Sequence, residues 1–89
     1  MAREIVLFES EEQMSLGDVI SFLHELADKL ATNEVTLQKG GESVTLQVPN
    51  RLLLEIKAEE ETKGERTQRS LEVELEWYEG EDDGPLSLG

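Results

Sequence analysis

The most regular pattern in the chain is an alternation of apolar and acidic residues over 71–77, which ends at the only tryptophan, Trp77. Successive side chains of a β-strand point to opposite faces of a sheet. The apolar residues of this stretch therefore share one face, and Glu72, Glu74 and Glu76 share the other. The pattern predicts a strand in a sheet that is buried on one side and acidic on the other.

Two glycine-containing turns predict β-hairpins on either side of residue 50. Gly40-Gly41 lies between the alternating segments 35–39 and 42–48, and a two-residue Gly-Gly loop is typical of a type I′ hairpin, in which both loop positions have positive φ. A second loop at Gly64-Glu65 closes the later hairpin. These loops set the following apolar cross-strand pairs: Leu37 with Val44, Val35 with Leu46, Ala58 with Leu71, Ile56 with Val73, and Leu54 with Leu75.

A corner at Pro49 is expected to join the two hairpins. Proline cannot donate to a strand ladder, and Asn50 tolerates the backbone that a tight loop requires. A three-residue loop over 49–51 would pair Val48 with Leu52. The four strands would then form one continuous meander.

An amphipathic helix is expected from Leu16 to about Thr32. Ser15 is its predicted N-cap, accepting a hydrogen bond from the amide of Asp18, and Asn33 is its predicted left-handed terminator. The apolar positions recur at helical spacing and form one stripe: Leu16, Val19, Ile20, Leu23, Ala27 and Leu30.

An additional strand is expected over residues 4–11, where Ile5 to Phe8 are apolar on both faces. The complete prediction is an α+β domain with two layers, in which one amphipathic helix packs on a mostly antiparallel five-stranded sheet. The elements follow the order strand, helix and four strands. We expect one domain over residues 1–79, followed by an acidic, disordered tail over 80–89.

The charge of the chain narrows its function. Its 89 residues carry 21 Asp and Glu against 8 Lys and Arg, a formal net charge of −13. This surface repels phosphate groups, so neither nucleic acid nor an anionic membrane is expected as a partner. In molar salt the screening length is about 3 Å, so repulsion between the carboxylates of the chain costs little stability. The acidic composition therefore favours a salt-adapted host. The absence of cysteine, of a long apolar run and of a signal-like start leads us to expect a cytoplasmic protein.

Candidate chemistry is sparse. His24 is the only histidine and Asp28 lies one helical turn later, which makes a cation-dependent site near His24 one hypothesis, although two ligands are too few for zinc or iron. No serine has a local base or a nucleophile-elbow context, so we expect neither an enzyme nor a cofactor. Trp77 is interpreted either as a core residue or as an amphipathic anchor at a sheet edge. Three residues outside the predicted core form a candidate interaction surface: Phe22, Leu53 and Tyr78.

The ordered set of segments resembles the amphi-Trp domain family, small prokaryotic proteins that are frequent in haloarchaea. The segments are 7–11, 25–30, the Gly40-Gly41 hairpin and the amphipathic stretch that ends at Trp77. The resemblance supports the halophile interpretation and brings over no catalytic residue. The leading hypothesis is a non-catalytic protein-interaction module, with a homodimer as one form. The alternative is an acidic decoy that mimics nucleic acid and engages a basic protein through Glu72, Glu74 and Glu76.

Overall fold

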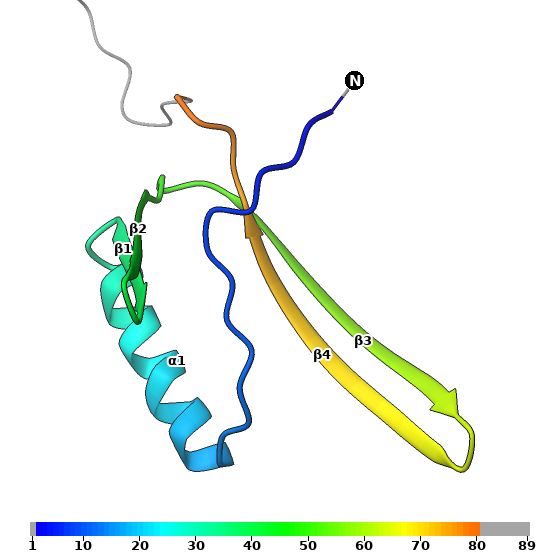
Figure 1. Cartoon of the computed structure of the whole chain (residues 1–89). Coiled ribbons are helices and arrows are strands. Elements are labelled where there is room, and N and C mark those ends of the chain that lie inside the picture. Colours follow the sequence, from blue (N-terminus) through cyan, green and yellow to red (C-terminus); the bar gives the residue numbers. More distant parts are fainter. Residues whose placement is uncertain (1, 81–89) are drawn as a thin grey trace, which may run out of the picture. The chain divides into compact units, whose positions relative to one another are not determined.

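The computed structural model describes residues 2–80, which contain one helix and four strands. The chain divides into two compact units, Met1–Val48 and Pro49–Gly89. The first unit holds α1 (Leu16–Leu30), β1 (Glu34–Lys39) and β2 (Glu42–Gln47), and the second holds β3 (Leu53–Lys63) and β4 (Arg66–Glu76) (Figure 1). The α+β class is confirmed. The expected tail at 80–89 lies, apart from Gly80, outside the described residues.

In the first unit, α1 packs against β1 of the β1–β2 hairpin. The N-cap prediction is confirmed, because the Ser15 hydroxyl accepts a hydrogen bond from the Asp18 amide at 3.0 Å. Val35 of β1 is buried, and the core around it is completed by half-buried apolar residues: Leu26, Leu30, Leu37, Val44 and Leu46. The first turns of the helical stripe remain exposed, with Leu16 the most accessible.

α1 ends at Leu30 with Ala31 as its C-cap, two residues before the expected end at Thr32, and Asn33 lies in the turn that leads into the hairpin. Its φ of 62° confirms the predicted left-handed position. Its side-chain amide donates to the Val48 carbonyl at 2.8 Å, and its own carbonyl accepts from the Val48 amide at 2.8 Å. Both backbone groups of Val48 are therefore engaged by Asn33.

The predicted register of both hairpins is confirmed. β1 and β2 pair Leu37 with Val44 and Val35 with Leu46. In the second hairpin the three predicted apolar pairs also form: Leu54 with Leu75, Ile56 with Val73, and Ala58 with Leu71. One detail of the first turn was wrong. Gly40 has a positive φ of 60° but Gly41 does not, whereas the prediction required positive φ at both loop positions.

The prediction of a single five-stranded sheet was wrong. The described strands form two antiparallel sheets of two strands each, β1–β2 and β3–β4. The expected pairing of Val48 with Leu52 does not form, because the backbone of Val48 bonds to Asn33 instead. The expected packing of the helix on strands is seen within the first unit, where α1 lies against β1.

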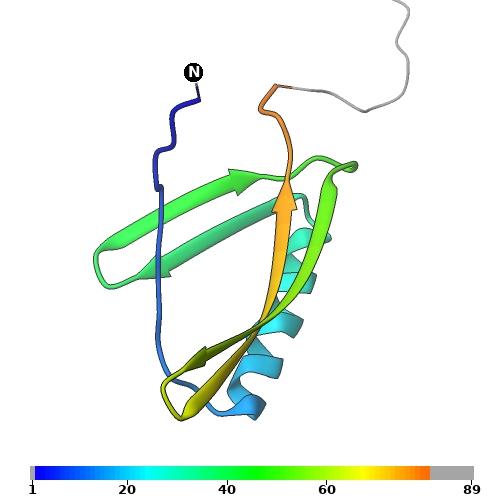
Figure 2. The same ribbon diagram turned by 90° about the vertical axis from the view of Figure 1, so that its right-hand side faces the viewer.

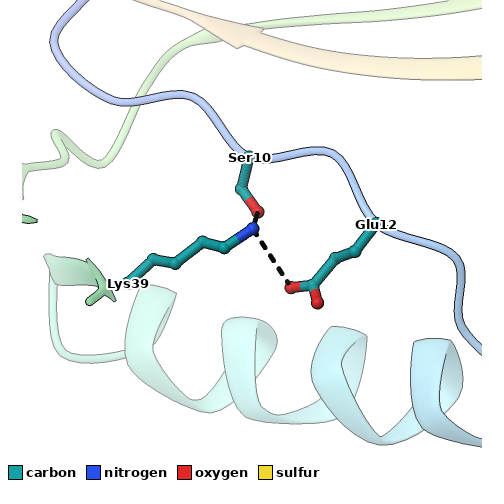
Figure 3. Close-up of polar contacts among 3 residues, drawn as sticks. All are labelled: Ser10, Glu12 and Lys39. Carbon is teal, nitrogen blue, oxygen red and sulfur yellow. Dashed lines mark hydrogen bonds and ion pairs between the residues drawn. The ribbon is translucent and has the colours of Figure 1, made fainter.

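Residues 4–11 do not form the expected first strand. The segment before α1 is held to its unit by side chains. The Lys39 ammonium group donates to the Ser10 hydroxyl at 3.1 Å and lies 3.9 Å from a carboxylate oxygen of Glu12 (Figure 3). An apolar run predicts that a segment will be covered, but a strand also needs a neighbour that accepts its backbone hydrogen bonds.

Candidate interaction surface

The second unit is a long hairpin of β3 and β4 (Figure 2), and the register of its strands gives it two chemically different faces. The strand register places six apolar residues on one side, which we call the hairpin face: Leu54, Ile56, Ala58, Leu71, Val73 and Leu75. The sequence predicted that this side would be buried. Within its own unit nothing covers it: Leu71 is 72% exposed and Val73 is 62% exposed, and of the six only Leu75 is half-buried. The second unit by itself therefore leaves the hairpin face as an apolar surface.

The opposite side of the hairpin carries a group of carboxylates at the open end of the strands. Glu55 of β3 lies directly across from Glu74 of β4, and Glu76 follows on the same face. Each of these three residues offers an oxygen, and the three oxygens lie within 4.8 Å of one another. We call these residues the acidic cluster. All three are exposed, so water competes with any cation that the oxygens could hold.

Repulsion within the acidic cluster changes the ionisation of one of its members. A hydrogen bond with Glu76 and the negative charge of Glu76 both raise the pKa of the Glu74 carboxyl group. The open end of β4 therefore holds negative charge at an electrostatic cost. A cation or a basic side chain placed beside it would reduce that cost.

The basic residues of β4 lie near its turn end, although Glu65 lies in the turn itself and Glu60 and Glu61 lie on the facing strand. Lys63 and Arg66 form the last cross-strand pair before the turn, and Arg69 follows on β4. Arg69 is 3.0 Å from a carboxylate oxygen of Glu60 on β3. Lys63 and Arg66 also line a shallow, open hollow together with Thr67 and Gln68. Charge along β4 therefore changes from positive near the turn to negative near Trp77.

Lys57 separates the two charged ends of the hairpin. Its ammonium group lies 2.9 Å from a carboxylate oxygen of Glu59. The hydrogen bond to Glu59, with the negative charges of Glu59, Glu72 and Glu55, raises the pKa of Lys57. Exposed ion pairs of this kind contribute little to stability, because water screens them, so they shape the charge of the surface more than the fold.

The residues proposed from the sequence as an interaction surface lie on both units. Phe22 belongs to α1 in the first unit and is 43% exposed. Leu53 begins β3, and Tyr78 follows the end of β4, with exposed fractions of 59% and 79%. Trp77 is half-buried. That Phe22, Leu53 and Tyr78 act together stays a prediction, and the larger hairpin face was missed because the helix was expected to cover it.

His24 is exposed on α1 and does not belong to the acidic cluster, the one group of three possible metal ligands found among residues 2–80. The acidic cluster could have been found from the sequence, since the predicted pair Leu54–Leu75 already implies that Glu55 lies opposite Glu74. No helix among residues 2–80 has both the length and the apolar character needed to cross a bilayer.

The fold and these surfaces define a small acidic α+β protein with an amphipathic hairpin that ends in tryptophan. The profile of the Amphi-Trp domain matches residues 1–88, so the chain belongs to the Amphi-Trp domain family. No curated protein and no solved structure matches the chain.

Proposed function

We propose that this chain is a small, non-catalytic protein-interaction module of a salt-adapted cytoplasm. The observation that supports this proposal is the exposed hairpin face. Burying a Leu, Ile or Val side chain from water contributes about 1.5–3 kcal/mol. The hairpin face exposes four such residues together: Leu54, Ile56, Leu71 and Val73. An apolar surface of a partner protein would bury them and so release this free energy.

The acidic surface fits this role in concentrated salt. The formal net charge of −13 keeps the chain soluble while the hairpin face stays available. At about 1 M salt the screening length is roughly 3 Å, so repulsion between acidic proteins is weak. Apolar contact then directs association. Nucleic acid and anionic membranes remain unfavourable partners, because both carry the same sign of charge as the protein.

Site-specific photo-crosslinking in the source organism tests the proposal. A photoreactive benzoylphenylalanine replaces Val73 on the hairpin face in one variant and Glu72 on the opposite face in the other. The two positions are adjacent in β4 but point to opposite sides. We expect a protein adduct from position 73 and little from position 72. If position 73 yields no protein adduct in these cells, the proposed function is wrong.

A second candidate function, an acidic decoy for a basic protein, is favoured by the acidic cluster and by Glu72 beside it. Binding through carboxylates weakens steeply with salt, because screening removes the attraction. Titration with a basic protein such as a histone, at increasing KCl, distinguishes this function from the first. Affinity that does not change with salt rules out the decoy.

A further inference from the structure

We propose that the partner of the second unit is another copy of this chain, joined antiparallel along β4, with Leu71 of both copies on the two-fold axis. The inference rests on the proposed function and names the partner for the same hairpin. The result is one four-stranded antiparallel sheet in the order β3, β4, β4 and β3. Both hairpin faces then lie on one side of that sheet and form a continuous apolar surface.

The second unit has a reason to extend its sheet. It pairs two strands of 11 residues each, and β4 has no ladder partner other than β3 among the described residues. An isolated two-stranded hairpin is at best marginally stable in water, whereas three or more strands with an apolar face gain independent stability. β4 contains no proline to block further pairing and carries three apolar residues on one face.

The register decides which backbone groups of β4 are available. The two-residue turn places Lys63 and Arg66 as its closing pair, and the carbonyl of the first residue of such a turn accepts from the amide of the fourth. Hydrogen-bonded and non-hydrogen-bonded pairs alternate from there. The outward-facing amides and carbonyls of β4 therefore belong to the odd-numbered positions: Thr67, Arg69, Leu71, Val73 and Leu75.

The charge gradient of β4 selects an antiparallel arrangement centred on Leu71. In this register Arg66 lies opposite Glu76 of the second copy, and Arg66 thus meets the end where Glu74 and Glu76 repel each other. Ser70 lies opposite Glu72, and Leu71 lies opposite Leu71. All 11 residues of β4 are paired, and the five outward-facing positions supply about ten backbone hydrogen bonds between the copies.

Other arrangements are less favourable for identifiable reasons. Centring β4 on Glu72 places Glu72 opposite itself, and directly opposed like charges destabilise a sheet. Centring on Ser70 leaves Leu75 and Glu76 without partners. Pairing β3 with β3 around Ala58 places Glu55 opposite Glu61, and directly opposed like charges destabilise a sheet. The register centred on Leu71 opposes no like charges, although it places Val73 opposite Arg69 and Leu75 opposite Thr67, so its advantage lies in the pairing of Arg66 with Glu76 at each end of β4.

Cysteine crosslinking tests the register directly, because the chain has no cysteine of its own. Opposed residues in a hydrogen-bonded antiparallel pair have Cα atoms about 5.5 Å apart, within the range that a disulfide bridges. We expect Leu71→Cys to form a disulfide-linked dimer on mild oxidation of the full chain in molar KCl. Val73→Cys is the matched control, since the two copies of residue 73 would lie about 13 Å apart along the strand. Equal crosslinking of both variants overturns the proposed register.

Proline substitutions test the edge. The outward amide of Leu71 is used only between copies, so Leu71→Pro removes hydrogen bonds of the dimer and none of the β3–β4 ladder. Ala58→Pro makes the same change directly across the hairpin, on the outer edge of β3. In sedimentation equilibrium with the full chain, we expect the first variant to be monomeric and the second to dimerise. A dimer that survives Leu71→Pro overturns the proposal.

Exchanging the charges of Arg66 and Glu76 tests the same dimer without proline, so the test still holds if a proline variant fails to fold. At the lowest KCl concentration that preserves the native circular dichroism spectrum, we expect Arg66→Glu to raise the dimer Kd about tenfold. The double variant Arg66→Glu with Glu76→Arg should restore the Kd to within about threefold of the unsubstituted chain. Failure of this rescue overturns the proposal. So does a monomer at every concentration. If the chain is monomeric but position 73 still yields an adduct with a different protein, the proposed function stands and the dimer alone is wrong.

Discussion

The turn between β1 and β2 offers a test of how backbone conformation, separated from packing, stabilises this fold. Gly40 and Gly41 are adjacent, and an added Cβ atom would meet nothing within 4 Å at either position. Only Gly40 has a positive φ, 60°. Replacing either glycine with alanine therefore introduces the same methyl group into open space. The replacement strains the backbone at position 40 and leaves it unstrained at position 41.

The expected magnitudes have opposite signs. Alanine in the left-handed region costs about 1–2 kcal/mol, while replacing glycine with alanine stabilises by about 0.4–1 kcal/mol through the lower entropy of the unfolded chain. Gly40→Ala should therefore lower the free energy of unfolding by about 1 kcal/mol. Gly41→Ala should raise it by about 0.4–1 kcal/mol. In a domain of this size, 1 kcal/mol corresponds to about 4–8 °C in Tm.

Urea denaturation followed by far-UV circular dichroism, in molar KCl, measures the difference. Gly40→Asn serves as a further control, because asparagine enters the left-handed region more readily than alanine and should lose less stability. The two alanine variants should differ by about 1–2 kcal/mol. If Gly40→Ala and Gly41→Ala change the free energy of unfolding equally, the assignment of strain to residue 40 alone is wrong.

Three further outcomes follow from contacts described above. Ser15→Ala should lower the free energy of unfolding by about 1 kcal/mol and Ser15→Asp should retain it, measured by thermal melting of the helix, because the side chain caps α1. Asn33→Ala should cost about 2 kcal/mol in urea denaturation and Asn33→Gly about 1 kcal/mol, because glycine keeps the left-handed backbone while it loses the side-chain hydrogen bond to Val48. NMR titration should place the pKa of Glu74 above that of an ordinary glutamate, and Glu76→Ala should lower it. Because the pKa of Glu74 is raised in the folded state, its protonation contributes favourably to the free energy of unfolding at low pH, and this contribution is lost as the pH rises through the folded-state pKa. Glu74→Gln should therefore flatten this part of the dependence of stability on pH. A Glu74 pKa that does not respond to Glu76→Ala would contradict the assigned cause.

The sequence predicted those parts of the fold that depend on neighbours in the chain. The pair Ile56–Val73 followed from a two-residue loop and an alternating pattern, and the capped start of α1 followed from Ser15 and Asp18. Both are local, because the interacting residues are brought together by short turns. By contrast, Asn33 and Val48 lie 15 residues apart in the sequence, and one of their hydrogen bonds comes from a side-chain amide that no periodic pattern reveals. That contact prevented the predicted pairing of Val48 with Leu52.

The candidate surface was predictable in composition but not in exposure. The sequence separated Val73 from Glu72 by alternation, and the structure places them on opposite sides of the hairpin. The pattern also implied that Val73 would be covered, yet nothing within its own unit covers it. Alternation identifies which side chains share a face, because it follows from strand geometry. It does not identify what covers that face, since a helix of the same chain and a second molecule require the same apolar pattern.

The two short turns have a consequence for the speed of folding. Each strand pair among residues 2–80 joins strands separated by only two residues of chain. Hairpins of this kind form in about 1–10 μs, and chains dominated by such local pairs have low contact order and fold quickly. Backbone pairing within a chain should therefore finish early, at a rate that does not depend on protein concentration. Encounter between molecules is the slower event, and refolding at increasing dilution should separate the two kinetically.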